Sequence, residues 1–119
     1  MRAAAVILLL LTLGGAARAQ VDVIDLLPSC KKVYANPEAQ KNMTAGESLS
    51  FGYCLGVVTS IFDLGPRLSS DEKFCPPQAS RPRDAMNIIV SYVEAKRSSK
   101  ESLYVLGLEA LQQAWPCKK

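Results

Sequence analysis

Residues 44–66 of the chain read TAGESLSFGYCLGVVTSIFDLGP and predict a long helix. Thr44 and Glu47 have the spacing of a capping box, in which each side chain accepts a hydrogen bond from the other residue's backbone N–H. Apolar residues then recur at steps of three and four, which predicts one buried stripe made of Phe51, Cys54, Leu55, Val58, Ile61 and Phe62. Gly65 followed by Pro66 predicts the end of the helix.

Three further helices are predicted around this one. The first spans residues 25–34, with Asp25 as its N-cap. The third spans residues 81–97, with Ser80 as its N-cap, and its expected inward residues are Ala85, Met86, Ile89, Tyr92 and Val93. The fourth begins at the capping box of residues 98–101 and stops at Pro116, and its expected stripe is Tyr104, Gly107, Leu108, Leu111, Ala114 and Trp115. No run alternates apolar and polar residues as a strand does, so we predict an all-α fold.

Residues 1–19 are predicted to be an export signal, with Arg2 as its positive start, an apolar stretch over 6–13 and an A-x-A cleavage site ending at Ala19. Cleavage there leaves residues 20–119 as one domain. Arg2 and Arg18 leave with the signal, so the mature chain carries 12 Lys/Arg against 11 Asp/Glu. This balance argues against nucleic acid or an anionic membrane as the partner. The only long apolar run is the one in the signal, so no membrane insertion of the mature chain is expected.

The composition excludes several classes of catalytic and metal-binding site. The chain contains no histidine, which excludes Ser-His-Asp and Cys-His catalysis and histidine-ligated metal sites. No pattern recommends catalysis by carboxylates or lysine. We therefore expect a protein that is not an enzyme and that has no cofactor and no metal.

The cysteines number four, and all follow the predicted signal. An even number in a small exported domain indicates two disulfides, and the absence of a C-x-x-C pair disfavours zinc. Helices joined by a short turn are antiparallel neighbours, which brings the start of the third helix near the end of the fourth. Helix order therefore favours Cys30–Cys54 and Cys75–Cys117 among the three possible pairings. The predicted architecture is a small four-helix domain of two helical hairpins, stapled by these two disulfides.

Two further features suggest contacts. Gly52 and Gly56 lie four residues apart beside the predicted stripe, and glycine within a helix costs up to ~1 kcal/mol relative to alanine. We expect another helix to approach closely there, with a functional role as the alternative. Residues 66–80 form the longest predicted non-helical segment, and segments of this length are often functional. Residues 36–43 are a second candidate loop.

Ordered motifs give the chain a resemblance to a known family. They are GYCLGVV at 52–58, FCPP at 74–77, IIVSYV at 88–93 and LEALQQAWPC at 108–117. Together they resemble the Rap/Tai family of immunity proteins of bacterial type VI secretion. The family pattern is a cysteine within a G-Y-x-x-G-like helix, an F-C-x-P loop and an A-L-x-x-x-[FW]-P-C ending. This chain departs from it in having Pro76 where an aliphatic residue is usual, and in lacking a His-Pro pair within 95–99.

The resemblance implies a periplasmic, all-helical, disulfide-bonded protein that is often a homodimer. Its implied role is to bind a peptidoglycan amidase effector and to block the active-site cleft. Our candidate partner-binding loop is residues 66–80, with contacts from Arg67, Asp71, Glu72, Lys73 and Phe74; the alternative for Phe74 is a place in the core. The alternative functions are a periplasmic chaperone similar to the Hde acid-stress proteins, and an orphan envelope protein of unknown partner.

Overall fold

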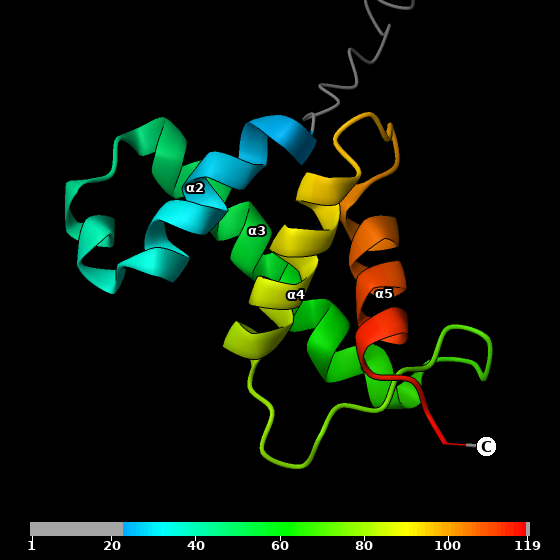
Figure 1. Cartoon of the computed structure of the whole chain (residues 1–119). Coiled ribbons are helices and arrows are strands. Elements are labelled where there is room, and N and C mark those ends of the chain that lie inside the picture. Colours follow the sequence, from blue (N-terminus) through cyan, green and yellow to red (C-terminus); the bar gives the residue numbers. More distant parts are fainter. Residues whose placement is uncertain (1–22, 119) are drawn as a thin grey trace, which may run out of the picture.

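The computed structural model describes residues 23–118 (Figure 1). Over this range the chain forms the α-helices α2 (Val23–Ala35), α3 (Ala45–Leu64), α4 (Pro82–Ala95) and α5 (Leu103–Ala114), the 3-10 helices η1 (Pro37–Asn42) and η2 (Gly65–Arg67), and no strand. α2 and α3 form one hairpin through η1, and α4 and α5 form the other. The predicted all-α domain of two helical hairpins is confirmed. The predicted signal peptide and its cleavage site lie outside the described residues.

α3 begins and ends where the sequence predicts. The Thr44 hydroxyl accepts from the Glu47 N–H at 3.2 Å, and the Glu47 carboxylate accepts from the Thr44 N–H at 2.8 Å. At the other end the Gly65 N–H donates to the Ile61 carbonyl, and Pro66 continues the chain into η2. The local capping signals therefore set both boundaries of this helix.

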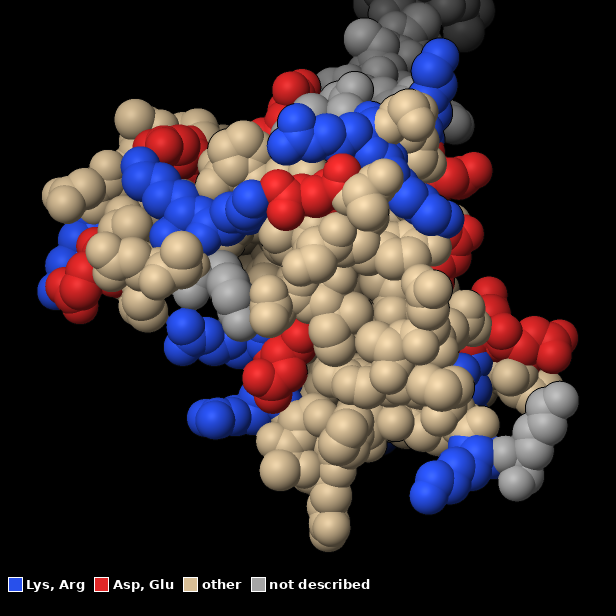
Figure 2. Space-filling model, in the orientation of Figure 1, with Lys and Arg blue, Asp and Glu red and all other residues tan. Residues whose placement is uncertain are grey.

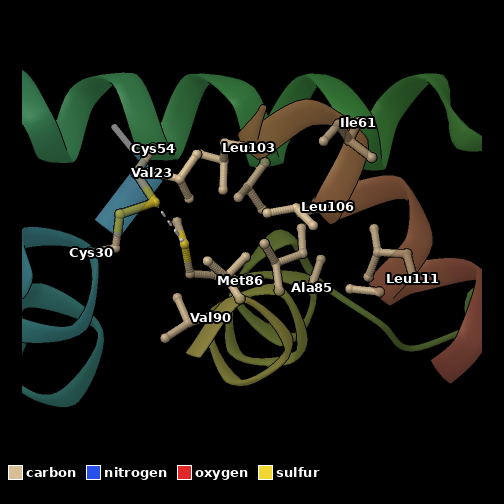
Figure 3. Packing of buried hydrophobic residues seen from close by; sticks show 14 of the residues in the cluster. Val23, Cys30, Cys54, Ile61, Ala85, Met86, Val90, Leu103, Leu106 and Leu111 are labelled. Atoms are coloured by element: carbon tan, nitrogen blue, oxygen red, sulfur yellow. Dashed lines mark hydrogen bonds between the residues drawn. A yellow bond between two sulfur atoms is a disulfide. The ribbon is translucent and has the colours of Figure 1, made fainter. Parts of the chain in front are cut away.

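The core lies between α3 on one side and α2, α4 and α5 on the other (Figure 3). α3 contributes Cys54, Val58 and Ile61, whereas Leu55, which was predicted to be buried, is 43% exposed. The Cys30–Cys54 disulfide is itself buried in this core, and the Met86 sulfur lies 3.4 Å from the Cys54 sulfur. A covalent bond thus joins α2 to α3 at a point where α4 also packs.

Three helix starts differ from the prediction. α2 is already helical at Val23, so Asp25 lies in its first turn and is not its N-cap. α4 begins at Pro82, and its N-cap is Arg81, whose N–H donates to the Asp84 carboxylate at 2.8 Å. α5 has Ser102 as its N-cap, four residues after the predicted one.

The buried face of α5 also differs from the predicted stripe. Residues between α4 and α5 form a turn, in which the Ser99 N–H donates to the Lys96 carbonyl. The helix that follows buries Leu103, Leu106, Gly107, Leu108, Ala110 and Leu111. Tyr104 and Ala114, which were predicted to face inward, are exposed. The inward residues predicted for α4 are confirmed, except that Tyr92 is only half-buried.

One segment of the described chain, Ala45–Arg67, is long and apolar enough by length and composition to cross a membrane. The expectation that the signal holds the only long apolar run was therefore wrong. Of its most apolar 18-residue window 22% is buried, and this inner face lies in the core and carries the disulfide to α2. We treat the segment as part of the domain.

Ion pairs on the surface join the helices in pairs. Lys32 links α2 to α3 through Glu47 at 3.0 Å, and Lys31 links α2 to α4 through Glu94 at 2.5 Å. The Thr44 backbone N–H, and after it Lys32, lowers the pKa of Glu47, and Lys31 lowers the pKa of Glu94. A carboxyl group whose pKa is lowered by folding stabilises the fold above its unfolded pKa, here near 4.5. That contribution is lost as the pH falls through the lowered pKa.

α4 and α5 are joined in the same way. The Tyr92 hydroxyl donates to the Glu109 carboxylate at 2.9 Å, and the Lys96 ammonium donates to it at 3.2 Å. The Tyr92 hydrogen bond, and after it the Lys96 hydrogen bond, lowers the pKa of Glu109. The charged side chains of these inter-helix pairs are 31–50% exposed, so each pair contributes little to stability.

We expect Gly65→Ala to destabilise the protein by about 1–3 kcal/mol through overpacking. A Cβ at Gly65 would lie 2.1 Å from Cζ of the buried Phe74 ring, whereas the backbone there is ordinary right-handed helix (φ −46°, ψ −46°). The cost is therefore steric alone. Urea unfolding followed by circular dichroism measures it, with Gly46→Ala as the control, because a Cβ at Gly46 meets no atom within 4 Å. Equal stability of Gly65→Ala and the wild type would contradict the seating of Phe74 on Gly65.

Candidate functional site

The segment 68–81, between η2 and α4, is the longest non-helical stretch of the described chain. It projects from the end of the helical domain as a turn on one side and then crosses to the start of α4 (Figure 1). It overlaps the predicted loop of residues 66–80 at positions 68–80. The structure shows how this segment is held.

The base of the segment is fixed by aromatic packing. Phe74 is fully buried, with its ring against Gly65 and its centroid 6.3 Å from that of Trp115. Trp115 packs edge-on against Phe62 of α3 at 6.2 Å, so it connects the ends of α3 and α5 to the segment. These contacts hold Phe74 in the core, where it is not accessible to a partner. Its selection as a partner contact was wrong, and the alternative of a core position is confirmed.

Covalent and backbone bonds fix the next residue. The Cys75 N–H donates to the Trp115 carbonyl at 2.8 Å. The Cys75–Cys117 disulfide, with 4.9 Å between its Cα atoms, then ties the segment to the chain beyond α5. The pairing predicted from helix order, Cys30–Cys54 and Cys75–Cys117, is confirmed.

The projecting part is a turn over residues 69–73, which we call the 69–73 turn. The Ser69 carbonyl accepts from the N–H groups of Glu72 at 3.0 Å and Lys73 at 2.9 Å. The Ser69 hydroxyl also donates to the Glu72 carboxylate at 3.3 Å. A side chain of α5 supports the turn from outside, because Gln112 Nε2 donates to the Asp71 carbonyl at 2.8 Å. The sequence reasoning missed Gln112, since no local pattern marks a contact between residues 41 positions apart.

The four charged residues predicted for the site are all exposed. Asp71, Glu72 and Lys73 lie on the 69–73 turn, and Arg67 lies at its foot in η2. Among the described residues no ion pair involves any of the four. Figure 2 shows acidic side chains where the turn projects from the edge of the molecule. The turn thus presents both signs of charge without pairing them within the fold.

The second candidate loop is largely helical. Residues 37–42 form η1, which Asn36 caps by accepting from the Glu38 N–H at 3.1 Å, and Lys41 pairs with Glu38. η1 lies at the far end of the molecule from the 69–73 turn (Figure 1). The two candidate loops of one chain therefore do not form a single contact surface.

A third surface is the outer face of α3. Leu49 is 76% exposed and Tyr53 is 51% exposed, and a Cβ placed at Gly52 or Gly56 meets no atom within 4 Å. No other helix within residues 23–118 approaches these glycines, so the expected close packing does not occur in the described part of the chain. Of the two charged residues in α3, Glu47 is bonded to Lys32 and Asp63 is exposed at the far end. The middle of this outer face is therefore uncharged.

Within residues 23–118 no group of three or more His, Cys, Asp or Glu side chains is placed to hold a metal ion. The perturbed pKa values described above belong to exposed carboxylates that pair between helices.

A comparison with protein-family models matches residues 22–117 to the Rap1a immunity proteins. The match spans all four described helices and both disulfides. No curated protein and no solved structure matches the chain.

The two disulfides should differ in their accessibility to reductant. Cys75 is exposed and Cys117 half-exposed, whereas Cys30 and Cys54 are each only 1% exposed. Because exchange requires a thiolate to reach a sulfur, a low concentration of dithiothreitol should open the outer bond at least about tenfold faster than the inner one. Alkylation and peptide mass mapping after timed reduction measures both rates. Equal labelling of all four cysteines would contradict this prediction.

Proposed function

Because the chain belongs to the family of Rap1a immunity proteins, we propose that it is a periplasmic immunity protein of type VI secretion. In this proposal it binds a peptidoglycan amidase effector and blocks the effector's active-site cleft. It would thereby protect the producing cell from the enzyme's action on its own cell wall. Two disulfides support an oxidising compartment such as the periplasm, since cytosolic thiols are kept reduced.

The observation that carries the inhibitory mechanism is the fixed geometry of the 69–73 turn. Phe74 and the Cys75–Cys117 disulfide anchor its base, and hydrogen bonds to the Ser69 carbonyl close it. A segment that is already ordered loses little conformational entropy when it enters a cleft. Inhibition of this kind needs no catalytic group, because the loop acts by occupying the place of the substrate.

The charges of the turn suit recognition of a partner. Arg67, Asp71 and Lys73 are exposed and make no ion pair among the described residues, so they are available to charges on an effector. Complementary charges at an interface speed association and fix its register. Phe74 contributes indirectly in this proposal, by holding the turn in place from the core.

Replacing Arg67, Asp71 and Lys73 together by alanine should weaken inhibition of the effector about tenfold or more, mainly through slower association. These side chains are exposed, so the helical spectrum and the melting temperature should not change. The measurement is an assay of peptidoglycan cleavage by the amidase encoded beside the gene, combined with binding kinetics.

The matched control is Arg97→Ala, Lys100→Ala and Glu101→Ala, which removes the same number of charges of each sign. These exposed residues lie between α4 and α5, at the opposite end of the molecule (Figure 1). Equal inhibition by the loop variant and the wild type would refute the loop as the contact. Failure of the wild type to inhibit the amidase would refute the immunity role toward that enzyme.

We also propose that the protein is a homodimer, in which the outer faces of two α3 helices pack antiparallel. Gly52 and Gly56 allow two helices to approach closely, and the uncharged middle of the face brings no like charges together. A twofold pair also uses the same patch on both copies, as closed dimers do.

Gly56→Leu should prevent this association, because the added side chain holds the two helices apart at a cost of about 1–3 kcal/mol. The position has no neighbour within the chain, so the monomer fold should be unaffected. Sedimentation velocity at micromolar concentration measures the association, with Ser91→Leu on the exposed side of α4 as the control. A wild type that sediments only as a monomer would overturn the dimer.

A further inference from the structure

Gln112 makes a contact that links the helical domain to the projecting part of the site. Its amide donates to the Asp71 carbonyl at 2.8 Å across a separation of 41 residues. It is half-buried on α5, one turn before Trp115, whose carbonyl accepts from Cys75. The last turn of α5 therefore holds the loop at two points, at its base and in the 69–73 turn.

The contact at the base of the loop and the contact at the 69–73 turn differ in what would follow from their loss. At the base, the disulfide and the buried Phe74 ring keep the chain in place even when a single hydrogen bond is lost. The 69–73 turn has no buried side chain, and its own hydrogen bonds all lead to Ser69 or Glu72 within it. Without a contact to the rest of the domain, exposed turns of this kind open locally at a low cost in free energy. The Gln112 hydrogen bond is the described contact that ties the turn to a rigid helix.

We propose that Gln112 is a positioning residue, which sets the orientation of the 69–73 turn for binding to the effector. This inference rests on the proposed function and adds to it a residue that makes no contact with the effector. When only a fraction of molecules holds the binding conformation, the observed affinity falls by that fraction. Removing the hydrogen bond should therefore lower affinity by reducing the population of the correctly placed turn, with every charged contact still present.

The test compares Gln112→Met with Gln112→Lys. Methionine has a similar length and no donor, whereas lysine keeps an N–H donor within reach of the Asp71 carbonyl. The control is Gln113→Met. Gln113 is the exposed neighbour of Gln112, and its side chain makes no hydrogen bond within residues 23–118. Amide hydrogen exchange of Glu72 and Lys73 is measured on the free protein, and amidase inhibition and melting temperature are measured beside it.

Gln112→Met should speed exchange of these two amides about tenfold and weaken inhibition about tenfold, with the melting temperature unchanged. Gln112→Lys should restore both towards wild type, and Gln113→Met should change neither. Unchanged exchange in Gln112→Met would overturn the inference, because the hydrogen bond would then not order the turn. Faster exchange with undiminished inhibition would overturn the positioning role and leave the immunity function in place. A wild type that fails to inhibit would overturn the proposed function itself, a result distinct from both.

Discussion

The burial of Phe74 is the contact on which the presentation of the site depends. Its ring takes the space that a side chain at Gly65 would need, and it packs against Trp115 at the end of α5. The chain leaving α3 is therefore drawn back into the domain only nine residues after Gly65, and residues 69–73 must project as a turn. Cys75 follows immediately, so the Cys75–Cys117 disulfide locks a position that aromatic packing has already selected. Hydrophobic burial and a covalent closure thus act on adjacent residues.

Three glutamates on the surface join neighbouring helices. Glu47, Glu94 and Glu109 bond to lysines or a tyrosine on neighbouring helices. The Thr44 backbone N–H, and after it Lys32, lowers the pKa of Glu47, whereas Lys31 lowers that of Glu94 and Tyr92, followed by Lys96, lowers that of Glu109. Their contribution to stability is present above about pH 4.5 and is lost only as the pH falls through the lowered pKa values. The chain has no histidine, so it lacks the side chain that usually titrates near pH 6. A chaperone that unfolds in acid would have to use carboxylates of this chain as its switch, whereas an immunity protein needs Glu47, Glu94 and Glu109 only to keep its helices in place.

The sequence predicts those parts of the fold that local signals determine. The capping box of α3 involves residues three apart, and the order of the helices was enough to choose both disulfides. The predicted start of α5 was wrong because residues 98–101 also have the form of a capping box, whereas in the structure the Ser102 hydroxyl caps the helix by accepting from the Val105 N–H. The prediction that another helix packs against Gly52 and Gly56 was wrong for a related reason. Their spacing shows that they share a side of α3, and only the packed structure shows that this side is the outer one.

The parts of the site that could be predicted also depend on local sequence, and the part that could not depends on contacts between distant residues. Exposure of Arg67, Asp71, Glu72 and Lys73 follows from charged residues in a proline-bounded segment, which the sequence shows directly. The support given by Gln112 depends on where the end of α5 lies relative to the end of α3, a relation between distant parts of the chain. An inhibitor that uses a loop needs both parts, because exposed charges give recognition and a fixed backbone limits the entropy lost on binding. In this protein the loop sequence supplies the exposed charges, and the packing of α3 against α5 supplies the fixed backbone.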